Sequence, residues 1–174
     1  MRYRGPSLEE LHENYAKRHR IDKAAPIHSA HEVVIDAPAE RVWALLADPA
    51  GWPSFDPAIR DVRVAGSDGA AVDMQFVWVN GRTTITSRFA VVEPLREITW
   101  TGTAMGSRAA HRHLITPHQD GTTLLRTEES MSGALLGLFY NSAKLHAELI
   151  RWLTSIKQVL HRLHRHPKSI RPGR

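Results

Sequence analysis

The sequence predicts a single α+β domain in which a curved antiparallel sheet of about seven strands wraps around one long C-terminal helix. Two observations carry this prediction. Between residues 60 and 131, stretches of alternating apolar and polar residues follow one another with only turn signals between them, which is typical of a meandering antiparallel sheet. From Ala134 to His164 the chain contains no proline, and leucines recur at spacings of three and four, which indicates one amphipathic helix.

Residues 1–27 are expected to form a helical extension that precedes the sheet. Ser7 can accept a hydrogen bond from the backbone of Glu10, and the Glu10 side chain can return one, which is the pattern of a capping box. The apolar stripe of this helix is thin, so we expect it to pack on the outside of the domain or against another subunit. A homodimer formed through this helix stays open as an alternative.

The first strand is expected at residues 28–36, and two short helices follow it. Pro38 is placed to start the first of them, because proline is favoured in the first turn of a helix. Asp48-Pro49 ends that helix, and the broken segment 51–57 follows. The other strands are expected at residues 60–65, 72–79, 82–92, 97–103, 108–116 and 122–131. Asn80-Gly81, between two of them, is the strongest hairpin signal in the chain.

Charge and composition exclude several classes of function. The formal net charge is +5, but residues 149–174 hold seven Lys and Arg and no acid, while residues 28–148 hold fourteen acids and ten bases. We therefore expect residues 165–174 to be a basic, disordered tail and predict no nucleic-acid partner. The absence of cysteine excludes disulfides, a thiolate nucleophile and cysteine-ligated zinc. No apolar run is long enough to cross a membrane, and no secretory signal opens the chain, so we expect a cytoplasmic protein without stable membrane insertion.

Two groups of residues resemble a known family. Residues 34–48, followed by Trp52-Pro53, are similar to the opening of the START-like (SRPBCC) superfamily. The second half resembles its polyketide cyclase/dehydrase-like branch through Trp100-Thr101-Gly102, His111, Gly121-Thr122, Glu129 and Gly133. The resemblance covers about residues 28–160 and implies a helix-grip domain at residues 28–164 that encloses a cavity for a small hydrophobic molecule. The high ratio of arginine to lysine is compatible with a bacterial source.

Strand parity predicts which side chains face that cavity. Alternate residues of a strand share one face, and the more apolar register should face the helix, while the opposite register suits water. This reasoning nominates eight ligand-binding residues: Phe76, Trp78, Ser87, Phe89, Trp100, Gly102, Thr127 and Met131. The stripe of the long helix that should face the sheet adds Leu138 and Ser142. Aromatic residues also fill ordinary cores, so the same set is compatible with a solid interior.

The same register places His111, His113 and Glu129 inside, and we nominate them as catalytic residues. An imidazole beside a carboxylate can move a proton to and from an enolisable carbonyl, as an aldol cyclisation and dehydration requires. Alternatively, the two histidines bond to the backbone and Glu129 pairs with an arginine at the rim. These three residues also form a two-histidine, one-carboxylate set, but the spacing is weak evidence and we predict no metal.

We therefore expect a polyketide cyclase- or aromatase-like biosynthetic protein that binds an aromatic or polyketide-like molecule. The resemblance implies a cyclase or dehydratase that needs no cofactor. Two alternatives stay open. The protein could instead be a non-catalytic carrier for a lipid or an isoprenoid. It could also be an interaction module whose basic ends contact a membrane or an acidic partner.

Overall fold

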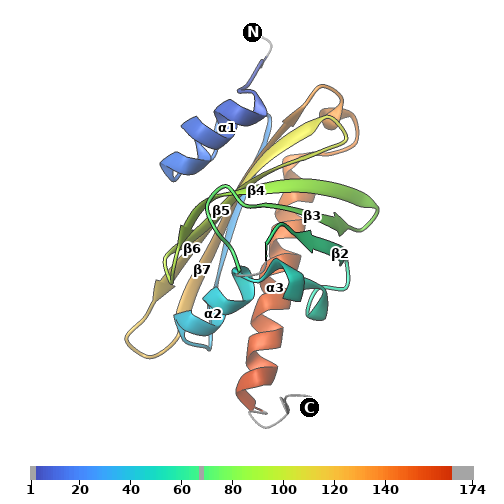
Figure 1. Cartoon of the computed structure of the whole chain (residues 1–174). Coiled ribbons are helices and arrows are strands. Elements are labelled where there is room, and N and C mark those ends of the chain that lie inside the picture. Colours follow the sequence, from blue (N-terminus) through green and yellow to red (C-terminus); the bar gives the residue numbers. More distant parts are fainter. Residues whose placement is uncertain (1–2, 67–68, 166–174) are drawn as a thin grey trace.

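The computed structural model describes residues 3–66 and 69–165 and confirms the predicted α+β fold (Figure 1). Seven strands form one curved antiparallel sheet with the order β1-β7-β6-β5-β4-β3-β2. The strands are β1 (Ile27–Ile35), β2 (Ile59–Val64), β3 (Gln75–Asn80), β4 (Thr83–Glu93), β5 (Glu97–Ala104), β6 (Ser107–Pro117) and β7 (Thr123–Gly133). Consecutive strands pair from β2 to β7, and β1 pairs with β7, so β1 and β2 form the two edges of the sheet.

Helices cover both faces of this sheet. The α-helices are α1 (Leu8–Asn14), α2 (Ala39–Leu46) and α3 (Ser142–Arg165), and the short 3-10 helices are η1 (Ala16–Arg18), η2 (Pro49–Ser54) and η3 (Leu136–Leu138). Figure 1 shows the long α3 running along the concave side and α1 lying on the opposite side. The two short helices predicted after the first strand are α2 and η2. No described helix has the length and apolar character needed to cross a membrane.

The outer face of the sheet is partly covered, which corrects the expectation that this register faces water. The predicted capping box is present, because Ser7 Oγ accepts from the Glu10 amide at 3.2 Å and Glu10 Oε2 accepts from the Ser7 amide at 2.8 Å. The helix that it starts buries Leu11 against Ala110 of β6. Thr101 on β5 is 2% exposed for the same reason. The N-terminal segment therefore packs on the sheet of its own chain.

The long helix begins later than predicted. It starts at Ser142 instead of Ala134, and Asn141 caps it, because Asn141 Oδ1 accepts from the Lys144 amide at 2.9 Å. The preceding residues cross from β7 to the helix through η3 and leave three large side chains exposed: Leu135, Leu138 and Phe139. The basic tail predicted at 165–174 lies outside the described residues, apart from Arg165 at the end of α3.

The hairpin between β3 and β4 is shifted by one residue from the predicted turn. Asn80 pairs with Thr83, so the two-residue loop is Gly81-Arg82 and not Asn80-Gly81. Gly81 has a φ of +60°, a conformation that glycine adopts without strain and that a two-residue hairpin requires at its first loop position.

Trp52 of η2 lies at the centre of the core between the sheet and α3. It is fully buried, and its Nε1 donates to the carbonyl of Leu45 at 3.0 Å. Its ring makes edge contacts with Phe76, Trp78 and Trp152 at centroid distances of 5.4–5.7 Å. One side chain from a short connecting segment thus contacts β3 and α3 together.

We predict that Trp52→Ala lowers the free energy of unfolding by about 3–5 kcal/mol, because it removes a buried indole and leaves a hole that the rigid surroundings fill only in part. Urea denaturation followed by circular dichroism would measure this loss. The matched control is Leu138→Ala, whose side chain is 81% exposed and whose truncation should change stability by less than about 0.5 kcal/mol. Equal losses in the two variants would contradict the central role of Trp52.

Candidate ligand cavity

A cavity of about 390 Å³ lies between the concave face of the sheet and α3. Its walls come from η2 and the start of β2 with the segment between them, from β3 to β7, from the β7–α3 connection and from α3 itself. The volume falls within the range of about 300–1,000 Å³ that is usual for small-molecule sites. The interior therefore contains a cavity, whereas the sequence was also compatible with a solid core.

Four tryptophans from four different elements form much of the wall. They are Trp52, Trp78, Trp100 and Trp152. The indole nitrogens of three of them donate hydrogen bonds inside the protein, to Leu45 O, Ser87 Oγ and His113 Nε2. The fourth, Trp100 Nε1, is buried without a protein partner. The same is true of the Thr127 hydroxyl and of His113 Nδ1, whose residues also line the cavity. The wall thus combines a large apolar area with three unsatisfied polar groups.

His111 and Glu129 lie side by side in the cavity wall. They face each other directly across β6 and β7, and His111 Nδ1 is 3.1 Å from Glu129 Oε2. The Glu129 residue is only 5% exposed. The ring of His111 also stacks on Trp100 at a centroid distance of 5.4 Å. The predicted imidazole and carboxylate are therefore in contact, and Nε2 is the ring nitrogen that remains for a ligand.

His113 has a different environment, although it is on the same face of β6. It is 1% exposed, stacks on Trp100 at 4.5 Å, and accepts a hydrogen bond from Trp152 Nε1 through its own Nε2 at 3.1 Å. Burial, with a smaller contribution from the charge of His111, lowers the pKa of His113 to about 3. At neutral pH the ring is uncharged and carries its proton on Nδ1. His113 therefore acts as a packed hydrogen-bond acceptor.

The structure adds polar groups that the sequence did not reveal. Tyr140 and Glu148 line the cavity, and burial together with the Glu148 carboxylate raises the pKa of the Tyr140 hydroxyl. Arg151 also lines it and forms an ion pair with Asp56, which is fully buried. Tyr140 precedes a helix start that the sequence pattern missed, and Asp56 and Arg151 are 95 residues apart. No local signal connects such positions.

Eight of the thirteen nominated residues line the cavity. They are Trp78, Trp100, Gly102, Thr127 and Met131 of the ligand-binding set, together with His111, His113 and Glu129. Gly102 has a clear reason to be glycine, because an added Cβ would lie 3.0 Å from Ser87 Oγ and 3.3 Å from Ile85. A side chain here would press on β4 and narrow the cavity.

The other five nominated residues are not part of the cavity lining, which corrects their assignment as ligand-binding residues. Phe76 and Phe89 stack on each other at 4.7 Å and are fully packed in the core around Trp52. Ser87 is buried and accepts from Trp78. Leu138 is 81% exposed because η3 turns it outward, and Ser142 Oγ instead accepts from the amide of His28. Strand parity predicts which side chains face the interior. It does not predict at which end of the sheet those side chains line a cavity.

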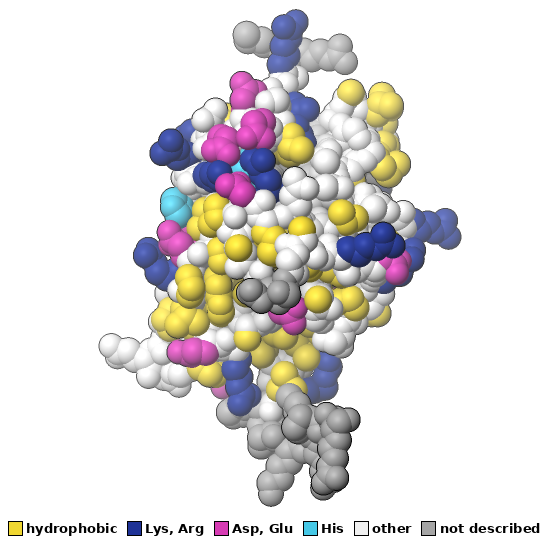
Figure 2. All heavy atoms as spheres, in the orientation of Figure 1, with side chains coloured by type: hydrophobic (Ala, Val, Ile, Leu, Met, Phe, Trp, Pro, Cys, Tyr) yellow, Lys and Arg dark blue, Asp and Glu magenta, His cyan; other side chains and the backbone are white. Residues whose placement is uncertain are grey.

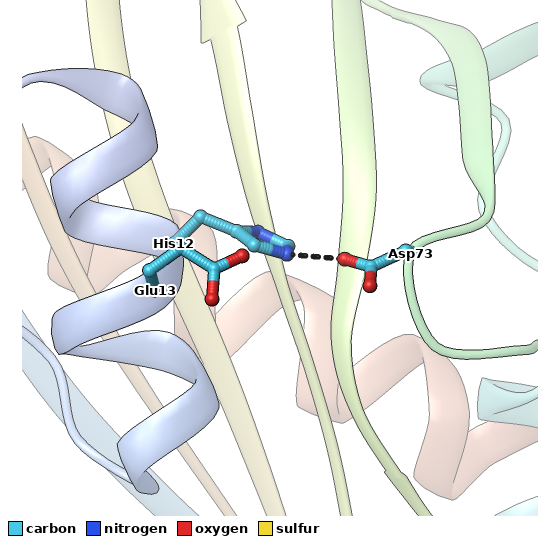
Figure 3. Close-up of side chains that lie close together, drawn as sticks. All are labelled: His12, Glu13 and Asp73. Carbon is cyan, nitrogen blue, oxygen red and sulfur yellow. Dashed lines mark hydrogen bonds and ion pairs between the residues drawn. The ribbon is translucent and has the colours of Figure 1, made fainter.

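Within the described part of the chain, one group of three side chains has the spacing of metal ligands, and it lies on the outer face (Figure 3). It consists of His12 and Glu13 of α1 with Asp73 before β3. Lys17 Nζ lies 2.9 Å from both carboxylates, and Arg88 Nε lies 3.0 Å from His12 Nε2. Two protein cations therefore already neutralise these acids, and the group clamps α1 to the sheet.

Comparison with known proteins places the chain among similar sequences and folds. The family model described as "Polyketide cyclase / dehydrase and lipid transport" matches residues 26–166. No curated protein matches the chain.

Solved structures share the fold at low sequence identity. A hypothetical protein from Helicobacter pylori has a TM-score of 0.70 at 17% identity, and the alignment covers 91% of this chain and 96% of that one. A START superfamily protein from Mycobacterium smegmatis has a TM-score of 0.65 at 16% identity and covers 78% and 98%. DynU16, from the dynemicin biosynthetic locus, has a TM-score of 0.61 at 16% identity and covers 77% of this chain and 47% of its own. At such identities the likeness shows the fold alone.

We predict that His113 makes stability depend on pH. Because its pKa falls from about 6.5 when unfolded to about 3 when folded, the unfolded chain binds the extra proton between these values. The free energy of unfolding should therefore fall as the pH falls from about 6.5 towards 3, by up to about 1.4 kcal/mol per pH unit from this group. Denaturation at a series of pH values would measure the slope.

His113→Phe should lose this part of the slope, whereas His118→Phe, a change at an exposed turn, should retain it. Identical slopes for the wild type and His113→Phe would show that the ring is not held neutral by burial.

Proposed function

Because the chain belongs to the polyketide cyclase, dehydrase and lipid transport family, a START-like family, we propose that it binds a small, largely apolar molecule in its cavity and acts on it as a cyclase or dehydratase. The observation that carries this proposal is the His111–Glu129 contact within a wall of tryptophans. An aromatic or polyketide-like molecule fits the wall, because flat rings pack well against indoles.

The geometry supports proton transfer by His111. A carboxylate 3.1 Å from Nδ1 favours the tautomer with its proton on Nδ1, and this leaves the lone pair of Nε2 as the base. Nε2 can remove a proton from a carbon next to a carbonyl group of the ligand. This deprotonation gives an enolate whose negative charge lies mainly on the carbonyl oxygen. The imidazolium that forms is stabilised by Glu129. It can then return the proton to the alkoxide after the enolate carbon has attacked a second carbonyl, or to a departing hydroxyl.

Three unsatisfied polar groups support the same chemistry. Trp100 Nε1, His113 Nδ1 and the Thr127 hydroxyl have no protein partner and belong to side chains of the cavity wall. A ligand oxygen that accepts from one of these donors would gain most when it carries the negative charge of an enolate. The largely apolar wall can hold the ligand in a folded conformation, so that positioning supplies a large part of the rate.

One observation favours the alternative of a lipid or isoprenoid carrier. Met105 at the β5–β6 turn and Leu135 and Phe139 in the β7–α3 connection are 82%, 66% and 53% exposed, and all three also line the cavity. Figure 2 shows hydrophobic side chains over several parts of this face of the molecule, with one group at its upper right end. An apolar rim of this kind lowers the cost of moving an apolar ligand in or out.

We predict that the protein catalyses exchange of the α-protons of a bicyclic ketone such as tetralone for deuterium, and that His111→Gln lowers the rate by about 10²–10⁴-fold. Glu129→Gln should lower it less, because the imidazole remains. Nuclear magnetic resonance in deuterated water would follow the exchange. The control is His118→Gln, which alters an exposed histidine outside the cavity. Exchange that is unaffected by His111→Gln would remove this pair from the mechanism.

The carrier alternative predicts a different result. Native mass spectrometry of gently purified protein should then show a bound lipid, and Leu135→Ser with Phe139→Ser should slow its transfer to acceptor vesicles several-fold without changing the mass of the bound species. Bound lipid together with an absence of proton exchange would favour the carrier over the enzyme.

A further inference from the structure

The cavity is negatively charged as well as apolar. Glu129 and Glu148 contribute carboxylates to its lining, and Arg151 is the single Lys or Arg that lines it among the described residues. Arg151 is already paired with Asp56, whose carboxylate is fully buried. Three carboxylates thus face one guanidinium, which leaves two negative charges when both cavity imidazoles are neutral. One negative charge remains even when His111 is protonated.

Glu129 and Glu148 have no Lys or Arg partner among the described residues, and they act on the same part of the cavity. Tyr140 lines the cavity with them, and both acids raise the pKa of its hydroxyl. Burial first, and then these two acids, raise the pKa of the Tyr140 hydroxyl, while Arg151 opposes them with a smaller effect. The effect of the two acids on Tyr140 therefore exceeds the opposing effect of Arg151. The same two carboxylates penalise a second anion placed near Tyr140.

Burial increases the effect of this charge. The Glu129 residue is 5% exposed, and aromatic rings surround the cavity, so its field is screened less than that of a surface acid. The tryptophans of the wall favour a ligand with an apolar body, and the carboxylates favour a ligand with a positive charge. A fatty-acid carboxylate or a phenolate fits the wall but meets like charge.

We propose that the ligand of this cavity is an apolar amine, bound in its ammonium form near Glu129 and Glu148, and that the cavity discriminates against carboxylates of the same size. This inference rests on the proposed ligand-binding function and adds the chemical class of the ligand. The amine and the reactive carbonyl belong to different parts of one molecule, since the proton transfer assigned to His111 involves a neutral group.

Three probes with the same body and different charge test the proposal: phenylbutylamine, phenylbutanol and phenylbutyrate. Tryptophan fluorescence would report binding, because Trp43 is the only one of the five tryptophans that does not line the cavity. At neutral pH the amine should bind about tenfold more tightly than the alcohol, and phenylbutyrate about tenfold more weakly, each step corresponding to about 1.4 kcal/mol. The advantage of the amine should shrink as salt is added.

Two variants locate the charge. Glu148→Gln is an exposed change that leaves the fold intact, and it should reduce the preference for amine over alcohol several-fold. Glu129→Gln should reduce it further. The matched control is Glu40→Gln, an exposed carboxylate on α2 outside the cavity lining, which should leave all three affinities unchanged.

The outcomes separate this inference from the proposed function. Equal affinity for the three probes, or a preference for phenylbutyrate, would overturn the amine assignment and leave the ligand cavity standing. Failure of all three probes to bind would overturn both. A preference for the amine that survives both glutamate substitutions would place the charge elsewhere and contradict the proposed site.

Discussion

The burial of Trp52 between the concave face of the sheet and α3 is the interaction on which the shape of the interior depends. Its ring contacts Phe76, Trp78, Trp100 and Trp152, so it sets the spacing between sheet and helix at one point along their length. Around that point the space is filled, with Phe76 and Phe89 packed against each other. Farther along the sheet, small residues such as Gly102 and Ala109 do not fill the space between the sheet and the helix, and the cavity lies there. The packing around Trp52 therefore fills one part of the space between sheet and helix and leaves the cavity in the other part.

The outer layer supports the same arrangement from the other side. The α1 helix lies on the outer face of the strands that form the cavity wall, and His12 Nδ1 lies 2.7 Å from Thr101 Oγ1, directly next in sequence to Trp100. Lys17 and Arg88 join the acids of α1 and of Asp73 into one charged cluster. Because β4 and β5 are held on both faces, the backbone that carries Trp100 and Gly102 has little freedom to collapse into the cavity.

Within the cavity, small differences in surroundings give similar residues different roles. His111 and His113 share a strand and a face. The first contacts a carboxylate at 3.1 Å and retains a ring nitrogen for a ligand. The second is fully enclosed, bonded to Trp152, and kept neutral by burial. His111 is therefore the residue for which we propose proton transfer, and the carboxylates of Glu129 and Glu148 add negative charge to the cavity lining that a family resemblance does not specify.

The sequence by itself determined the fold class, the strands, the capping box at Ser7 and the register that brings His111 and Glu129 inward, because these depend on local periodicity and on side-chain alternation. It could not determine where α3 begins, since the stretch from Ala134 to Asn141 has the composition of a helix but serves as a crossing over the cavity mouth. It also could not distinguish Trp78 from Phe76 on one strand face, or pair Asp56 with Arg151. Only the tertiary structure decided these points, because they depend on distances between segments far apart in the chain and on where packing stops.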